Sequence, residues 1–600
     1  MKNISDKKLY YIQLFFFCVI GLIIIFHRSR MGVDLTDETW YSSEPYWVAK
    51  GSIPYVNNWT QASGFTLPLY LFFHLFISIS GSNTGIILFS RTLFCFWKVI
   101  VSLVSFLLLY KVGNRIPALL VIPVIVFVPF GLFDINYNTI GWSYIILALS
   151  VLYNAMNSKR SKRQRFCLGV LTGIIVGRAV IGTLASVLIC IVILLALIIN
   201  RDWTVLKGTV FGVIIAAIIV IAHCVVRGGF ANFVMGIQYF VRDQAYFDPV
   251  TSHKVPFAEN TAYLFQYMKP AMFSLLIVFI LRLFLGKRLD IFNKLITLYF
   301  GYILLVAIFH LSKYDGAYAG LDMATKYGWF IPLLSLLLNS NSEVKKIFEY
   351  STYIALSYMA VYVFQGYVTN YGFESRSYCN LIPLILSVYV LFICIDEMFG
   401  IMKLLYVRLF IESAICLCIA LFVVRGEYRF VYRDMPCQQL DTMVQEGIWK
   451  GCYTTSERAT TVVQIEKEIR KRTTPEDQVL CYGNWPCFIN LLSNGQLCAP
   501  NAIGTGQKNG FDYWHMYQKV PTKVFVHIDA EDVQGRMTSA YDLWNFIDRF
   551  YQQTSEYDYT SYDEYGEPRY YRIIEFEITD YEAALAYADE KATKIFELGW

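Results

Sequence analysis

Residues 66–80 read Thr-Leu-Pro-Leu-Tyr-Leu-Phe-Phe-His-Leu-Phe-Ile-Ser-Ile-Ser, and the topology of the chain depends on whether this stretch crosses a membrane. A membrane-spanning helix needs about 17–25 apolar residues. This stretch is shorter, with Pro68 near its start and His74 in its middle. These features favour a short helix that lies along the membrane surface.

The surrounding composition is that of an integral membrane protein. Of 600 residues, 56% are apolar and 16% are charged, whereas soluble domains carry about 25% charged residues. Mean hydropathy is +0.45. We predict about 13 transmembrane helices, a polytopic α-helical architecture. The candidate spans are 10–27, 86–110, 117–133, 139–156, 166–181, 183–200, 205–226, 270–285, 292–311, 327–339, 349–368, 378–396 and 404–424.

Basic residues in the loops orient these spans. If 66–80 does not cross, the basic run at 159–165 and the pairs Lys287/Arg288 and Lys345/Lys346 all fall on the cytoplasmic side with the N-terminus. That distribution obeys the positive-inside rule. We therefore expect a multi-pass protein of the cell membrane with a cytoplasmic N-terminus and an extracytoplasmic C-terminal region.

Charge divides the chain into two parts. Residues 426–600 contain 17 basic and 27 acidic side chains, whereas residues 1–425 contain 34 basic and 19 acidic ones. The basic excess lies beside apolar runs, which indicates membrane topology rather than nucleic-acid binding. We predict a transmembrane catalytic domain over 1–425 and a soluble extracytoplasmic domain over 426–600.

The C-terminal part alternates helical and strand patterns. Residues 456–472, 540–551 and 579–596 favour helices, and 477–483, 522–529 and 570–577 favour strands, which predicts a small α/β domain. The Tyr-rich run 551–571 alternates with acids, as a solvated hairpin would. Five cysteines in this domain leave at least one thiol unpaired.

The loop after the first span is rich in acids. Asp34, Asp37, Glu38 and Glu44 lie within one short segment, and Asp134 follows a later span. With 66–80 along the surface, all five share one side of the membrane. Such a cluster is either an ordinary solvated loop or a site in which partial burial tunes a carboxylate as a general base.

The same residues resemble the GT-C superfamily of glycosyltransferases, in particular bacterial enzymes similar to protein O-mannosyltransferase and aminoarabinose transferase. The resemblance rests on the acidic pair Asp37-Glu38, the Gly51-x-x-Pro54-Tyr55 turn, Pro68-Leu69-Tyr70 before a short amphipathic helix, and Asp134 after a later span. It covers roughly residues 30–200 by motif and the remainder by span pattern.

The resemblance implies a reaction and a set of residue roles. A sugar would move from a polyprenyl-phosphate carrier to an acceptor hydroxyl with inversion. Asp37 would be the catalytic base with Glu38 beside it, and Asp134 would orient the acceptor or the base. Inversion at an oxocarbenium-like centre needs one base on the attacking side, and a cation can stabilise the phosphate leaving group.

Four residues are candidates for that cation: Arg178, Arg376, Lys313 and Lys326. The two arginines suit bidentate phosphate contact better than the lysines. The alternative for each is a side chain that anchors its helix at the interface by reaching toward water. The external loop 227–269 is either a cover for the site or a polar segment.

The expected partners are a polyprenyl-phosphate-linked sugar donor, a glycan, lipid or protein acceptor, and the bilayer, with no nucleic acid. No cofactor is certain; a divalent metal held by Asp37, Glu38 and Asp134 is possible. Two other functions stay open, a transporter or flippase for lipid-linked saccharides and a non-catalytic polysaccharide assembly factor. The sequence shows no paired Gly/Pro-interrupted spans of the kind that transporters use.

Overall fold

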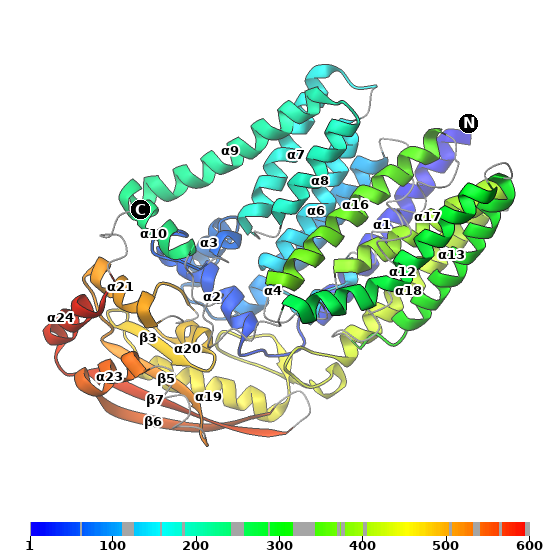
Figure 1. Ribbon diagram of the computed structural model, residues 1–600. Helices are drawn as coiled ribbons and strands as arrows, with labels where there is room; N and C mark the ends of the chain where they lie inside the picture. The colour runs from blue at the N-terminus through cyan, green and yellow to red at the C-terminus, as the bar shows by residue number, and fades with distance from the viewer. Residues whose placement is uncertain are drawn as a thin grey trace.

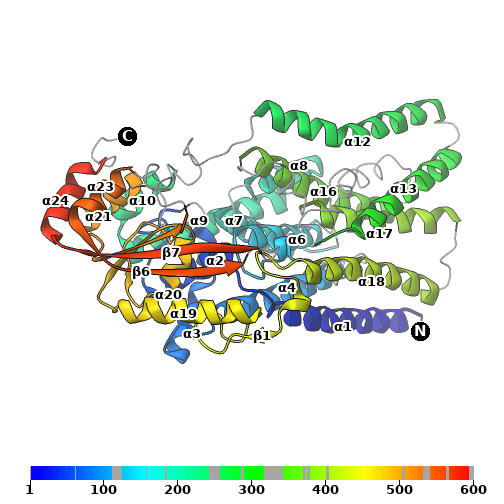
Figure 2. The ribbon, with the colours of Figure 1, turned by 90° about the horizontal axis from the view of Figure 1, so that it is seen from below.

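The chain folds into a helical bundle and a C-terminal sheet domain that is seated on one end of it (Figure 1). The computed structural model describes residues 2–60, 63–110, 125–156, 159–182, 186–241, 257–285, 289–315, 342–368, 373, 379–399, 405–502, 507–531, 541–562 and 567–593. The N-terminus lies at the end of the bundle remote from the sheet domain in both views (Figure 2).

Long apolar helices make up the bundle. They are α1 (Lys2–Arg28), α4 (Ile86–Tyr110), α6 (Tyr137–Ala155), α7 (Lys162–Gly182), α8 (Val187–Ile199), α9 (Trp203–Gly228), α12 (Phe257–Leu285), α13 (Leu289–Leu311), α16 (Ser342–Val368), α17 (Leu381–Phe399) and α18 (Leu405–Arg429). Each coincides with a predicted span, whereas 327–339 and most of 117–133 lie outside the described residues. The polytopic helical prediction is therefore confirmed, and the number of spans stays a prediction.

Six of the described helices are long and apolar enough to cross a membrane: Tyr11–Arg28, Ile86–Ser105, Lys162–Gly182, Trp203–Gly228, Phe257–Leu281 and Lys294–Leu311. In its described parts the predicted loop 227–269 contains helix, because α10 (Phe230–Val241) follows α9 and α12 begins at Phe257, with Pro270 inside it.

Glycines bring α7 and α9 into close contact. A Cβ at Gly173 would lie 2.0 Å from the carbonyl oxygen of Thr209, and one at Gly212 would lie 2.1 Å from that of Val170. Small residues at such crossings allow two backbones to approach closely. The glycines within 169–177 thus fix the position of α7 against α9. They thereby also fix the position of Arg178 near the end of α7.

Short helices lie between the bundle and the sheet domain. They are α2 (Asp37–Lys50), the 3-10 turn η1 (Ser63–Thr66) and α3 (Tyr70–Ser80). With 11 residues α3 is about 16 Å long, too short to cross a hydrocarbon core of about 30 Å. Its residues Leu71, Phe72, Leu75 and Ile79 are exposed. The predicted short helix within 66–80 is therefore present, and its position along a membrane surface stays a prediction.

The C-terminal domain is built on a five-stranded mixed sheet of order β4-β3-β5-β7-β6. Its strands are β3 (Gln478–Gly483), β4 (Gln496–Leu497), β5 (Lys523–Asp529), β6 (Tyr551–Tyr562) and β7 (Pro568–Ile578), and its helices are α19 (Ser456–Arg472), α20 (Pro486–Leu492), α21 (Gln507–Tyr517), α23 (Tyr541–Phe550) and α24 (Tyr581–Lys591). The α/β prediction is confirmed, and the Tyr-rich run is the β6–β7 hairpin.

Backbone and side-chain bonds join the domain to the bundle. Met31 pairs with Tyr453 in a parallel bridge. Asp434, which follows α18, accepts hydrogen bonds from Val33 N at 2.8 Å and Thr454 Oγ1 at 2.7 Å and an ion pair from Arg458 at 3.0 Å. Asp434 is 2% exposed, so these three segments are tied together by one buried carboxylate.

Candidate active site

The start of α2 is shaped by Asp34, the first acid of the loop. Asp34 accepts hydrogen bonds from Thr36 N at 3.0 Å, from Thr36 Oγ1 at 2.6 Å and from Glu38 N at 2.8 Å. Such bonds satisfy backbone donors that a helix N-terminus leaves without partners, and they place negative charge at the positive end of the helix dipole. Asp34 is therefore a capping residue that sets the direction of α2.

Glu38 is committed to a buried ion pair with Arg91 of α4. The Arg91 Nη2 atom donates to Glu38 Oε2 at 2.6 Å, and Nε donates to the other oxygen. Arg91 also donates to the carbonyls of Ser29 and Gly32, both at 2.8 Å. Both partners of the ion pair are buried. Arg91 therefore clamps the α1–α2 connection and the first turn of α2 to the bundle.

Glu44, the last acid of the loop, links α2 to the sheet domain. It accepts a hydrogen bond from the backbone N–H of Ala502 at 3.1 Å, one from Trp40 Nε1 at 3.3 Å, and one from the side-chain amide of Asn58. Glu44 is fully buried. Three of the four loop acids thus serve the architecture, and the fourth is the candidate for chemistry.

Asp37 is that fourth acid, and it is only half-buried. The hydroxyl of Tyr432, in the first turn after α18, donates to Asp37 Oδ2. Burial and the neighbouring Asp37 carboxylate raise the pKa of Tyr432 above its usual value, so the phenol stays neutral and donates. An ionised carboxylate offers about four lone-pair positions, so Asp37 can accept a further hydroxyl beside Tyr432.

Asp134 lies at the same end of the bundle as the first loop, as the predicted topology requires. It is fully buried and accepts hydrogen bonds from Ser42 of α2 at 3.2 Å and from Ser90 of α4. Burial, and secondarily the Glu38 carboxylate, raise the pKa of Asp134 well above its ordinary value. Asp134 joins α2 to α4 behind Asp37.

Replacing Asp134 by Asn is expected to preserve the fold and to make its stability less sensitive to alkaline pH. A carboxyl whose pKa is raised on folding stabilises fully below its unfolded pKa, and that stabilisation is lost as the pH rises through the folded pKa. Asn keeps an acceptor oxygen for one serine hydroxyl, offers an N–H donor to the other, and cannot ionise. Thermal unfolding from about pH 4 upward should show a flatter profile for Asp134→Asn; identical profiles would contradict the shift.

Arg178 sits at the end of α7 against the first loop. Its Nη2 atom donates to the carbonyl of Gly64 at 2.9 Å, and Nη1 is buried without a hydrogen-bond partner among the described residues. A Cβ at Gly64 would lie 2.0 Å from the carbonyl oxygen of Ile181, so only glycine allows η1 to approach α7 this closely. The arginine thus keeps donor capacity for a ligand.

Aromatic side chains connect Arg178 to the Asp37 region. Tyr41, one turn after Asp37, packs edge-on against Phe65 with centroids 6.2 Å apart, and Phe65 follows Gly64. Tyr137 at the start of α6 lies 5.9 Å from the rings of both Trp40 and Tyr41. The carboxylate and the guanidinium therefore flank one aromatic cluster.

Of the other predicted cations, Lys313 is the one that the structure describes, and it does not join this group. Lys313 is exposed at the end of α13, with its ammonium 5.7 Å from the centroid of Phe309. Arg376 and Lys326 lie outside the described residues. Among the described residues, no three or more His, Cys, Asp or Glu side chains are arranged to hold a metal ion.

A recess opens at the start of α2. Its lining comprises Met31, Gly32, Asp34, Glu38, Arg91, Gly131, Leu132, Val431 and Tyr432. Residues from both acidic loops, Arg91 of α4 and the start of the sheet domain thus meet at this recess.

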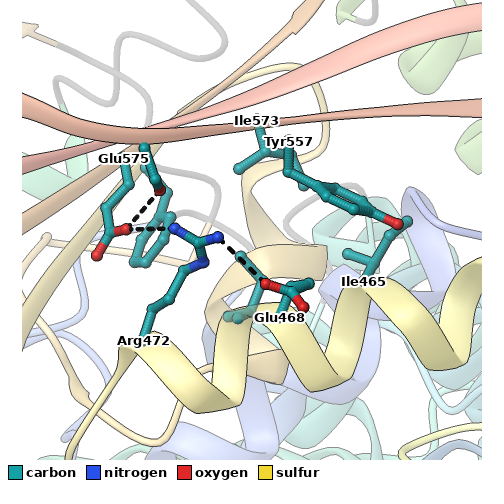
Figure 3. Close-up of a pocket in the computed structure, with 9 residues that line it drawn as sticks. Ile465, Glu468, Arg472, Tyr557, Ile573 and Glu575 are labelled. Carbon is teal, nitrogen blue, oxygen red and sulfur yellow. Dashed lines mark hydrogen bonds and ion pairs between the residues drawn. The ribbon is translucent and has the colours of Figure 1, made fainter.

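A second recess lies in the sheet domain between α19 and the sheet (Figure 3). There Arg472 bridges Glu468 and Glu575, each at 3.1 Å, and Lys523 contacts Glu575 at 3.2 Å. These charges satisfy one another, which makes this recess part of the packing of α19.

Two side chains of the site are not among the sequence-based candidates. Arg91 carries a signal that could have found it, because an ionisable residue inside an apolar span is by default a functional or structural hypothesis. Tyr432 carries none, since it is separated from Asp37 by 395 positions and only the fold brings them together.

Comparisons with known proteins found solved structures that are similar to this chain. No protein-family model and no curated protein matches it. Two solved structures align over 93% of the chain at 11% identity. The archaeal oligosaccharyltransferase AglB from Archaeoglobus fulgidus, in complex with an inhibitory peptide and a dolichol-phosphate, has a TM-score of 0.43 over 74% of its own length. ArnT from Cupriavidus metallidurans in the apo state has a TM-score of 0.39 over 97% of its length. At these scores the likeness assigns no residue role to this chain.

Proposed function

We propose that this protein is an inverting glycosyltransferase that moves a sugar from a polyprenyl-phosphate carrier to an acceptor hydroxyl on the outer face of the membrane. The observation that carries the proposal is the partial exposure of Asp37. Asp34, Glu38 and Glu44 are buried and serve capping, ion pairing and domain contact. Asp37 alone of the four is half-buried, and Tyr432, which donates to it, lines the recess.

The proposed step uses Asp37 as the general base. The acceptor oxygen attacks the anomeric carbon while its proton passes to the Asp37 carboxylate. The bond between the anomeric carbon and the phosphate oxygen breaks, and its electron pair leaves with the polyprenyl phosphate. One base on the attacking side gives inversion, and no acid is needed for a phosphate leaving group whose charge a cation stabilises.

Arg178 is the proposed partner of the phosphate. Its Nη1 atom is buried without a hydrogen-bond partner among the described residues, and a guanidinium offers donors in a geometry that matches phosphate oxygens. Asp134 is proposed as a positioning residue, because its bonds to Ser42 and Ser90 hold α2 against α4. Arg376, Lys313 and Lys326 stay candidates for further contacts to the donor.

The reaction is tested with purified full-length protein in lipid nanodiscs and a polyprenyl-phosphate sugar labelled in the sugar. Turnover is followed as release of label from the lipid, either to water or to added acceptors. The proposal expects release that depends on the protein, with an inverted anomeric configuration in the product. A retained configuration, or flipping of the intact donor between leaflets without release, would contradict it.

Replacing Arg178 by Gln is expected to raise the donor KM or lower kcat by at least about tenfold. Removing one partner of a buried charge contact costs about 2–5 kcal/mol, and 1.4 kcal/mol already corresponds to tenfold. Arg163→Gln is the matched control, since Arg163 is exposed near the opposite end of the same helix. Equal kinetics for the two variants would show that Arg178 is only an anchor.

A further inference from the structure

The edge of the sheet domain that faces α2 has the topology of a ligand site. Strands β3 and β5 are parallel neighbours, with Gly483 opposite His527 near their carboxyl ends. The chain leaves β3 through α20 toward β4 on one side, and it leaves β5 toward β6 and β7 on the other. The carboxyl ends of strands whose connections diverge in this way form a crevice that commonly binds ligands.

A strained residue stands at this position. Trp485, two residues after the end of β3, adopts φ 50° and ψ 50°, a left-handed conformation that is uncommon for a bulky residue and clusters at functional sites. His527 holds the turn, because its Nδ1 contacts the Asn484 carbonyl and its Nε2 lies 2.7 Å from the Tyr559 hydroxyl. A carbonyl only accepts, so Nδ1 carries the proton and the Tyr559 hydroxyl donates to Nε2.

Trp485 is half-buried and lies among aromatic and polar side chains. Its ring centroid is 4.6 Å from that of Tyr571. The side-chain amide of Asn484 donates to Asp529 Oδ1 at 3.0 Å. Burial and the Asp529 carboxylate raise the pKa of Tyr571, and the guanidinium groups of Arg569, Arg458 and Arg433 act against this rise. The Arg433 guanidinium lies 5.2 Å from the centroid of the Tyr432 ring. An aromatic face bordered by a fixed amide, carboxylate and guanidinium suits a ring with one apolar face and several hydroxyls.

This edge of the sheet adjoins the proposed catalytic base. Cys487, two residues after Trp485, is buried on α20, and α20 packs against α2, which begins at Asp37. Arg433 follows Tyr432, which donates to Asp37. Two segments therefore link the surroundings of Asp37 to the Trp485 turn. One is α20, and the other is the segment after α18.

We propose that Trp485, Asn484, Asp529 and Arg433 form an acceptor subsite of the sheet domain and that the acceptor they bind is a saccharide. The inference rests on the proposed transferase function and adds the acceptor class to it. The pyranose ring stacks its C–H face on Trp485, and its hydroxyls bond to the polar groups. An attacking hydroxyl of the same saccharide then reaches Asp37.

Saturation-transfer NMR on the full chain tests the subsite without turnover. The protein is placed in lipid nanodiscs free of glycoside detergent, and the probes are methyl glycosides of glucose, mannose and N-acetylglucosamine, together with a capped serine tripeptide. At least one glycoside is expected to receive saturation, strongest at the ring protons of one face. Trp485→Ala should weaken this binding by about tenfold or more, since the stacked ring supplies the apolar contact.

Tyr570→Ala is the control, because Tyr570 is 53% exposed on β7 beside Tyr571 and has no part in the subsite. If Trp485→Ala does not fold, the isosteric Asp529→Asn decides, with weakened binding expected. No signal from any glycoside, signals unaffected by both variants, or a Trp485-dependent signal from the peptide alone would each overturn the proposal. Because the measurement needs no turnover, its outcome is separate from that of the transfer assay.

Discussion

Replacing Asp37 by Asn is expected to lower kcat for sugar transfer by about 10²–10⁴-fold, the range that a positioned general base contributes. Asn cannot take the proton of the attacking hydroxyl. It still offers an oxygen to the Tyr432 hydroxyl, so the turn after α18 should stay in place. The measurement is the release of labelled sugar from the polyprenyl-phosphate carrier, with thermal unfolding recorded on the same samples.

The control for this variant removes a carboxylate of the same type elsewhere. Asp548 is exposed on α23, so Asp548→Asn should transfer sugar like the wild type. If Asp37→Asn retained full kcat with an unchanged melting profile, Asp37 would not be the base. The site would then have to use another group along the recess.

The largest expected effect on stability comes from replacing Arg91 by Met. The Glu38 carboxyl would be left in a buried setting without its counter-ion, and the carbonyls of Ser29 and Gly32 would lose their donor. Removing one member of a buried pair costs about 3–5 kcal/mol. Chemical unfolding in nanodiscs should therefore show a lower free energy of unfolding by about that amount.

The chain provides a matched comparison on its surface. Lys467 and Glu446 form an ion pair whose side chains are 63% and 55% exposed, and such pairs contribute about 0–1 kcal/mol. Lys467→Met should therefore leave the free energy of unfolding nearly unchanged. A further substitution, Glu38→Gln, in the Arg91→Met background should recover part of the loss, because it removes the carboxyl left without its counter-ion. Equal stabilities of Arg91→Met and Lys467→Met would refute the clamp.

Local patterns were sufficient to predict most elements of the fold. Apolar runs place the bundle helices because the bilayer sets their length, and α19 begins and ends where its sequence pattern predicts. The length of 66–80 and the loop charges predict that Asp37 and Asp134 share one end of the bundle. The bond between Ser42 and Asp134 shows that they do.

Contacts between distant segments could not be predicted in this way. The backbone N–H of Ala502, which donates to Glu44, is 458 positions from it in the sequence. Tyr432 is 395 positions from Asp37, to which it donates. Nothing in the spacing of the four loop acids distinguishes the cap, the ion pair and the domain contact from the half-buried carboxylate of Asp37. The burial of Asp134 likewise follows from the packing of α2 on α4. The sequence pattern of neither segment predicts this packing.

Sidedness is the central claim, and labelling with a membrane-impermeant maleimide tests it most directly. Single cysteines would be placed, in a background lacking the native thiols, at Lys50 at the end of α2, at Glu446 in the sheet domain and at Lys162 at the start of α7, all exposed positions. In intact cells we predict labelling at 50 and 446, and labelling at 162 only after the membrane is opened. Labelling of 50 and 446 from opposite sides would contradict a site shared by the first loop and the sheet domain.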